Sequence, residues 1–130
     1  MIARELGTSL ERWGRQYPAI TLIGPRQSGK TTLAKLVFPD KPYVNLEDVQ
    51  ERLFAARDPR GFLGRFREGA VFDEIQNAPE LLAQIQVEID ARPGEGRFVL
   101  TGSNQASLRA GISQSLAGRT AVGHLYPFTV

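Results

Sequence analysis

The stretch from residue 19 to residue 38 constrains the fold more than any other part of the sequence. It begins with the apolar run AITLIG, which is typical of a buried strand. A glycine, four further residues, a second glycine, a lysine and a threonine follow in GPRQSGKTT, and the apolar residues of SGKTTLAKLVF then recur at helical spacing. The stretch therefore predicts a strand, a glycine-rich loop and a helix in direct succession.

A loop of this kind directs backbone N–H groups and the N-terminus of the next helix at an anion. Lys30 supports this interpretation, because a lysine in the first turn of a helix opposes the helix dipole unless a bound anion balances it. We expect Lys30 to neutralise terminal phosphates and the Thr31 hydroxyl to bind Mg²⁺. The alternative is a glycine turn that only caps a helix. The expected nucleotide-binding residues are Gly24, Pro25, Arg26, Gln27, Ser28, Gly29, Lys30, Thr31 and Thr32.

The remaining elements alternate between strands and helices. Strands are expected over 19–24, 42–46, 69–75, 97–102 and 120–126, and helices over about 1–17, 28–38, 47–57, 62–66 and 79–91. We expect a break near Gly7 in the first helix, and two short helices split by Gly111 before the last strand. This order predicts one α/β domain, a parallel sheet with helices on both faces, in which a core of residues 18–130 follows the N-terminal helix.

Two acids follow the third apolar strand, in AVFDE. Because ligands of parallel α/β sheets bind beyond the carboxyl ends of the strands, Asp73 and Glu74 are expected at the same edge as the glycine loop. Asp73 is the expected second Mg²⁺ ligand, and Glu74 can accept a proton from an attacking water. A loop and one metal carboxylate suffice to hold a phosphate, whereas the second acid favours hydrolysis. The alternative is that both acids simply end a strand in solvent.

The fourth strand ends in VLTGSN, also at this edge. Thr101, Ser103 or Asn104 can hydrogen-bond a phosphate or orient a water, and the alternative is an N-cap for the next helix. Asn45 ends the second strand, where its amide either contacts Glu74 or begins a turn.

Composition narrows the class of protein. The 130 residues are enough for one domain, and 16 Lys and Arg against 14 Asp and Glu, without a basic run, do not indicate nucleic-acid binding. The absence of cysteine excludes disulfides and suits a reducing compartment. No stretch resembles a signal peptide or a membrane span, so a cytoplasmic protein is expected.

A larger set of motifs resembles one known group, the AAA-superfamily ATPases of archaea and bacteria that carry a C-terminal domain of unknown function. The motifs are GPRQSGKTTL, DPRGFL, VFDEIQ, PELL, RFVLTGSN, SLAGR and LYPF, in the family's order and over nearly the whole chain. The resemblance implies an ATP- and Mg²⁺-dependent enzyme of the P-loop NTPase fold, with five parallel strands ordered 5-1-4-3-2. It further implies a polar sensor at Ser103 or Asn104 and an arginine finger at Arg119, which a neighbouring copy in a homo-oligomer would receive.

Two alternatives stay open at this stage. Arg119 also fits a simple helix C-terminal arginine that interacts with the dipole. Members of the resembled family continue past LYPF with a helical lid and a C-terminal domain, whereas this chain stops at Val130. An edge strand at the end of the chain is expected to leave Leu125, Tyr126 and Phe128 poorly covered. The chain is therefore expected to be a fragment, a degenerate copy or an obligate oligomer.

The function predicted from the sequence is an ATPase core that couples hydrolysis to conformational change together with an unidentified protein partner. The competing hypothesis is a switch module that binds ATP or ADP and turns over negligibly. A GTPase is disfavoured, because no guanine-recognition motif of the form Asn/Thr-Lys-x-Asp occurs. A small-molecule kinase is disfavoured because Glu74 suits the activation of water.

Overall fold

A single parallel sheet organises residues 2–25, 28–103 and 106–125, which are the residues that the computed structural model describes. Its strands are β1 (Ala19–Ile23), β2 (Tyr43–Asn45), β3 (Ala70–Asp73), β4 (Phe98–Gly102) and β5 (Thr120–His124). They pair in the order β2-β3-β4-β1-β5, and every pair is parallel. This is the predicted order read from the other edge, so the predicted P-loop NTPase topology is confirmed.

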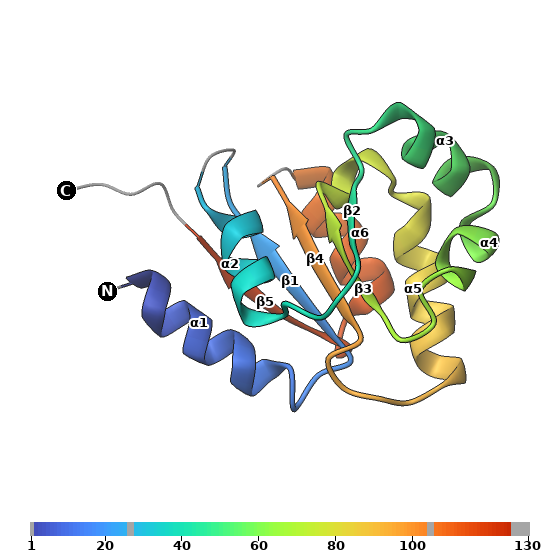
Figure 1. The fold of residues 1–130 in the computed structure, drawn as a ribbon. Helices are drawn as coiled ribbons and strands as arrows, with labels where there is room; N and C mark the ends of the chain where they lie inside the picture. Colours follow the sequence, from blue (N-terminus) through green and yellow to red (C-terminus); the bar gives the residue numbers. More distant parts are fainter. Residues whose placement is uncertain (1, 26–27, 104–105, 126–130) are drawn as a thin grey trace.

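Helices cover both faces of the sheet, which gives the three expected layers (Figure 1). The helices are α1 (Ile2–Trp13), α2 (Lys30–Val37), α3 (Val49–Arg57), α4 (Pro59–Gly64), α5 (Glu80–Ala91) and α6 (Ala106–Leu116), with a 3-10 turn η1 (Ile75–Asn77) after β3. The helices α1 and α2 lie on one face, and α3 to α6 lie on the other. In the described part of the chain, none of these helices is long and apolar enough to cross a membrane.

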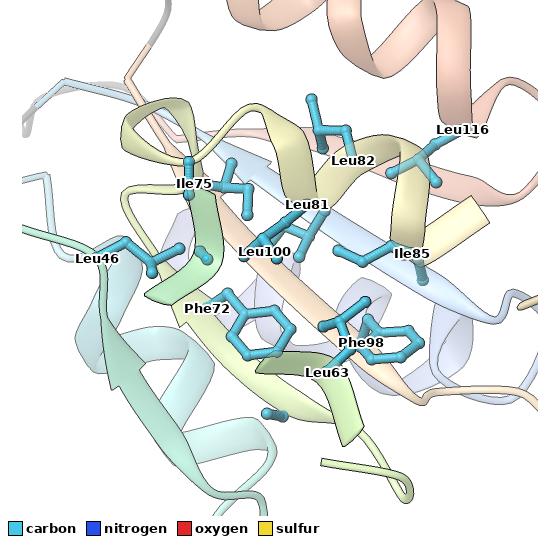
Figure 2. Close-up of a cluster of buried hydrophobic side chains, with 14 of the residues drawn as sticks. Leu46, Leu63, Phe72, Ile75, Leu81, Leu82, Ile85, Phe98, Leu100 and Leu116 are labelled. Carbon is cyan, nitrogen blue, oxygen red and sulfur yellow. The ribbon is translucent and has the colours of Figure 1, made fainter. Parts of the chain in front are cut away.

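The core alternates along the strands because successive side chains point to opposite faces. Val71 and Val99 pack with α1 and α2, whereas Phe72, Phe98 and Leu100 belong to the larger cluster under α3 to α6. Figure 2 shows this larger cluster, in which side chains of the sheet meet Leu81, Leu82 and Ile85 from α5 and Leu116 from α6. The Phe72 and Phe98 rings stack with their centroids 6.1 Å apart.

Gly7 and Gly111, at which the sequence analysis expected helix breaks, lie inside continuous helices. Gly7 sits within α1, where an added Cβ would lie 3.6 Å from the Leu33 side chain of α2. Gly111 sits within α6, where an added Cβ would lie 2.9 Å from the Leu82 side chain of α5. The prediction of two short helices was therefore wrong. At Gly111 the missing side chain serves close helix packing, and packing outweighs the low helix propensity of glycine.

The end of the described chain is better covered than the sequence predicted. Leu125 is buried at 7% exposure, and its N–H donates to the carbonyl oxygen of Ile23, so pairing with β1 continues past β5. The expectation that Leu125 would be poorly covered was wrong. Tyr126 and Phe128, for which the same was expected, lie outside the described residues.

The amino edge of the sheet is held by Arg97, which precedes β4. Its side chain is buried, and its guanidinium donates to the carbonyl oxygens of Glu88, Arg92 and Arg67. Gly69, with a φ of 101°, passes so close to the Arg97 backbone that a Cβ would overlap it. These contacts fix the ends of α5 and β3 at the edge opposite the glycine loop.

The core predicts a clear difference between Phe72 and Val87, which both belong to predicted apolar segments. Phe72→Ala should lower the free energy of unfolding by about 3–5 kcal/mol, because it opens a cavity beside Phe98 in the larger apolar cluster. Val87 is 54% exposed on α5, so Val87→Ala should change the free energy of unfolding by less than about 0.5 kcal/mol. Chemical denaturation of the two variants measures both values. Equal losses would contradict this description of the core.

Candidate functional site

The start of α2, the segment after β2 and the carboxyl end of β3 meet at one cleft. Its volume is about 430 Å³, which lies within the range of small-molecule sites. The cleft is lined by Gly29, Lys30, Thr31, Thr32, Glu47, Asp73 and Glu74. The structure therefore brings together the loop lysine, the threonine after it and both acids that the sequence singled out.

The glycine loop turns into α2 at Gly29, which has a φ of 88°. This left-handed conformation favours glycine, and the first N–H groups of the helix that follows have no partners within the helix. Within residues 2–25, 28–103 and 106–125, no side chain caps the start of α2, which suits the binding of an anion there. The buried hydroxyl oxygen of Ser28 has no hydrogen-bond partner within the described part of the chain. An uncapped helix start beside an orphaned hydroxyl fits a bound phosphate.

Lys30 and Glu74 face each other across the cleft. Lys30 is 4% exposed and Glu74 is 5% exposed, and their charged atoms lie 3.8 Å apart. The Lys30 ammonium also donates to the carbonyl oxygen of Pro25 at 3.3 Å. The Lys30 ammonium has three N–H donors, so beside its long ion pair and its carbonyl partner it can donate a hydrogen bond to a further anion.

Asp73 accepts hydrogen bonds from three hydroxyl groups. Thr31 donates to its Oδ1 at 3.0 Å, Thr101 also donates to Oδ1, and Tyr43 donates to Oδ2. The donors come from α2, β4 and β2, so the carboxylate links three elements to the end of β3. Hydroxyl and carboxylate oxygens are the protein ligands that Mg²⁺ prefers, and a threonine that donates its proton to Asp73 keeps its lone pairs for a cation.

Glu74 has an unusual backbone conformation. Its φ of 59° makes it the one residue other than glycine, among those that the structure describes, with a positive φ. Its N–H donates to Thr101 Oγ1 at 3.1 Å, which helps to hold the conformation. A non-glycine residue in this region carries a strain of order 1 kcal/mol or more, and such strain clusters at functional sites. The conformation turns the chain sharply from β3 into η1, with the carboxylate in the cleft.

The expected polar residues after β4 are placed only in part. Thr101 is buried and bonded to Asp73 and to the Glu74 backbone, and Ser103 follows Gly102 at the strand end. Asn104, together with Arg26 and Gln27 of the loop, lies outside the described residues. Asn45 accepts a hydrogen bond from the Glu47 N–H at 2.9 Å and so begins a turn, the second of its two sequence interpretations.

Arg119 lies at the opposite edge of the sheet from the cleft, just before β5 begins. Its guanidinium forms a two-pronged pair with Asp90 at 2.8 and 2.9 Å and donates to the Ala117 carbonyl at 3.2 Å. The hydrogen bond from Arg119 lowers the pKa of the Asp90 carboxyl below its usual value. Arg119 therefore does not reach the site of its own chain, and its contact near the end of α6 matches the alternative of a helix C-terminal arginine.

Sequence reasoning missed three residues that touch the site, of which the first is Glu47 in the lining of the cleft. Tyr43 belongs to no motif, but its hydroxyl donates to the Asp73 carboxylate. Burial is the larger cause and this hydrogen bond the second cause that raise the pKa of the Tyr43 hydroxyl. Gln76 donates to the Glu74 carboxylate at 3.3 Å. The available signal was positional, since Tyr43 begins the strand next to β3 and Gln76 lies two residues beyond Glu74.

Fold and site together define a P-loop, nucleotide-binding type of domain. A family model described as an AAA domain matches residues 16–130, and the chain belongs to this AAA-domain family. The chain is also 34% identical over 129 residues to the uncharacterized protein Rv2008c of Mycobacterium tuberculosis, covering 98% of this chain and 29% of that protein. The present chain therefore spans less than a third of the length of this relative.

Solved structures show the same fold. The Walker-type ATPase PABY2304 of Pyrococcus abyssi superposes with a TM-score of 0.67 and 22% identity, over 95% of this chain and 53% of that chain. A DNA replication initiation factor superposes with a TM-score of 0.59 and 15% identity, over 95% of this chain and 45% of that chain. At these identities the likeness supports the fold, and the chain is an AAA-type, P-loop ATPase-like domain.

The cleft predicts a specific loss of nucleotide affinity on removing Lys30. Lys30→Ala should weaken binding of ATP by about tenfold or more, because a charge-assisted hydrogen bond contributes about 1.5–3 kcal/mol. Isothermal titration calorimetry measures the affinity. Lys41→Ala is the matched control, because Lys41 precedes β2 and therefore lies near the amino ends of the strands, away from the cleft. An unchanged affinity of the Lys30 variant would remove the loop from the binding site.

Proposed function

We propose that this chain is an ATP-binding core that hydrolyses ATP to ADP and phosphate with Mg²⁺. The observation that carries the proposal is the meeting of Lys30, Glu74 and the Thr31–Asp73 pair in one cleft after a glycine loop. Adenine is the proposed base because the chain belongs to the AAA-domain family and because its sequence lacks a guanine-recognition motif. Residues 18–130 form the proposed nucleotide-binding core, and α1 packs against it.

Each of the binding residues has a proposed role. The loop from Gly24 to Thr32 holds the phosphates through its backbone N–H groups, and Lys30 neutralises the terminal charge. Mg²⁺, when bound, stabilises the charge that develops on the phosphate oxygens. Thr31 offers its hydroxyl oxygen to the ion, while the Asp73 carboxylate orients that hydroxyl and ligates the ion or its water.

Glu74 is the proposed general base. Its carboxylate is buried in the cleft and lies next to Lys30, so it adjoins the place where the terminal phosphate is expected. A carboxylate in this position accepts a proton from a water that attacks the terminal phosphorus, and the phosphate then departs from ADP. Ser103 or Asn104 is the proposed sensor that contacts the phosphate from the end of β4.

One observation favours the second candidate, a nucleotide-dependent switch with negligible hydrolysis. The Glu74 carboxylate is paired with the Lys30 ammonium at 3.8 Å, and an acid engaged in an ion pair is a weaker base. A nucleotide that draws Lys30 to its phosphates removes this pairing. Whether the released acid then activates water distinguishes an ATPase from a switch, and this is what the next experiment measures.

Glu74→Gln should separate binding from chemistry. The substitution keeps the shape of the side chain and leaves Asp73 in place, but it removes the base. Affinity for ATP should therefore persist while phosphate release falls by about 10² or more. Calorimetry and a phosphate-release assay measure the two quantities, and Glu80→Gln on the exposed start of α5 is the control. Parental turnover by Glu74→Gln, or no phosphate release by the parent, would favour the switch.

Arg119 is proposed as an arginine finger that a neighbouring copy receives in a homo-oligomer. Removing such a finger typically lowers turnover by about 10³ or more. Arg119→Ala should therefore bind ATP and fold normally, yet fail to hydrolyse it. Because Glu74→Gln retains Arg119, mixing the two inactive variants should restore part of the activity at their shared interfaces.

The control for this test is Asp90→Asn, which breaks the pair with Arg119 but keeps the arginine. If Arg119 acts only through Asp90 and the end of α6, both variants should lose the same small amount of thermal stability and keep their rate. Parental turnover of Arg119→Ala would reject the finger. An inactive Arg119 variant that mixing does not rescue would assign the residue a structural role.

The biological work of the domain is proposed as coupling of hydrolysis to conformational change. Because the chain spans only part of its longer relative, the partner and the moving element belong to the whole protein and are part of this proposal. ATP and ADP are the proposed ligands, with an unidentified protein as a further partner.

A further inference from the structure

The ladder between β3 and β4 ends one residue before the acids. The registered pairs run from Ala70 with Phe98 to Phe72 with Leu100. Beyond these pairs, side chains connect the two strand ends. Thr101 from β4 bonds the Asp73 carboxylate and the Glu74 N–H, and these contacts position the backbone of the second acid.

Gln76 forms the second of these connections. Its Nε2 donates to Glu74 Oε1 at 3.3 Å, and its Oε1 accepts from the Ser103 N–H at 3.2 Å. The amide can face only one way, because a carboxylate requires a donor and an N–H requires an acceptor. The side chain thus joins the carboxylate of Glu74 to the backbone of Ser103, one of the two residues proposed to contact phosphate.

The space for this bridge is provided at Gly102. A Cβ at this position would lie 2.9 Å from Gln76 Oε1 and would also collide with the Leu108 side chain. Asn45, a second amide near the strand ends in the described part of the chain, uses its oxygen for the turn at Glu47. In the described residues, Gln76 is therefore the amide that contacts Glu74.

We propose that Gln76 is a positioning residue that fixes the Glu74 carboxylate relative to the end of β4 during ATP hydrolysis. This inference rests on the proposed function, in which Glu74 is the base. When Lys30 turns to the terminal phosphate, Glu74 loses its nearest cation, and the Gln76 amide remains as its hydrogen-bond partner. Because the same amide holds the Ser103 N–H, the base keeps a fixed separation from Ser103, one of the two proposed sensor residues.

Two substitutions separate the two halves of the bridge. Gln76→Glu still accepts from the Ser103 N–H, but at neutral pH it cannot donate to Glu74 and it adds a like charge. Gln76→Ala loses both contacts. Gln84→Ala is the matched control, because Gln84 also donates to a glutamate, Glu88, at 3.3 Å, but along α5. All variants are made in the 130-residue chain.

Amide hydrogen exchange at Ser103, followed by NMR, tests the bridge without activity. Protection of this amide should fall at least about fivefold in Gln76→Ala and stay near the parental value in Gln76→Glu and Gln84→Ala. Unchanged protection in Gln76→Ala would show that Gln76 does not hold the Ser103 N–H and would overturn the proposal.

Steady-state phosphate release tests the positioning. In both Gln76 variants kcat should fall by about 10-fold to 100-fold, while the affinity for ATP changes less than about threefold. A purely structural bridge would spare Gln76→Glu, which keeps the contact with Ser103. In the Glu74→Gln background, Gln76→Ala should lower kcat by less than about twofold further, because it acts through Glu74.

The outcomes distinguish this inference from the proposed function. A parent that hydrolyses ATP, with Gln76→Glu at the parental rate or with full additivity in the Glu74→Gln background, overturns the role of Gln76 alone. A parent that releases no phosphate overturns hydrolysis, and with it the positioning of a base, whatever the exchange at Ser103 shows.

Discussion

The carboxylate of Asp73 is the group on which the arrangement of the site depends. It is 7% exposed at the end of a buried strand, where an unpaired charge would be costly. Three hydroxyl donors from α2, β2 and β4 offset that cost. The carboxylate in turn fixes the start of α2, and therefore Lys30 and the glycine loop, against the strands of the sheet. Loss of any one donor would leave fewer bonds to a buried charge, so the elements around Asp73 depend on one another.

Much of this arrangement could be predicted from the sequence because local patterns and global fold agree. The apolar run of β1, the glycines of the loop and the helical spacing of α2 each indicate the same unit, and five such strands leave few topologies for a parallel sheet. Asp73 and Glu74 were found because they directly follow an apolar strand. Their meeting with Lys30 then follows from the rule that the carboxyl ends of parallel strands lie at one edge.

What the sequence did not predict depends on contacts between distant residues. Gly111 reads as a break because its local propensity is poor, but the deciding factor is the Leu82 side chain, almost thirty residues earlier in the chain. The hydrogen bond of Tyr43 to Asp73 depends on the order of the strands, which places β2 beside β3. Likewise, the positive φ of Glu74 has no signature in the sequence, because glutamate rarely adopts it.

The strained backbone of Glu74 explains how two consecutive acids at a strand end can face the same cleft. If the chain continued in extended form, Glu74 would point to the face of the sheet opposite Asp73, because side chains alternate along a strand. The left-handed turn at Glu74 changes this, and both acids line the same cleft. The strain is offset by the bond from the Glu74 N–H to Thr101 and by contacts of its carboxylate with Lys30 and Gln76. The geometry that brings the two acids together is thus maintained by contacts of Glu74 with residues from α2, β4 and η1.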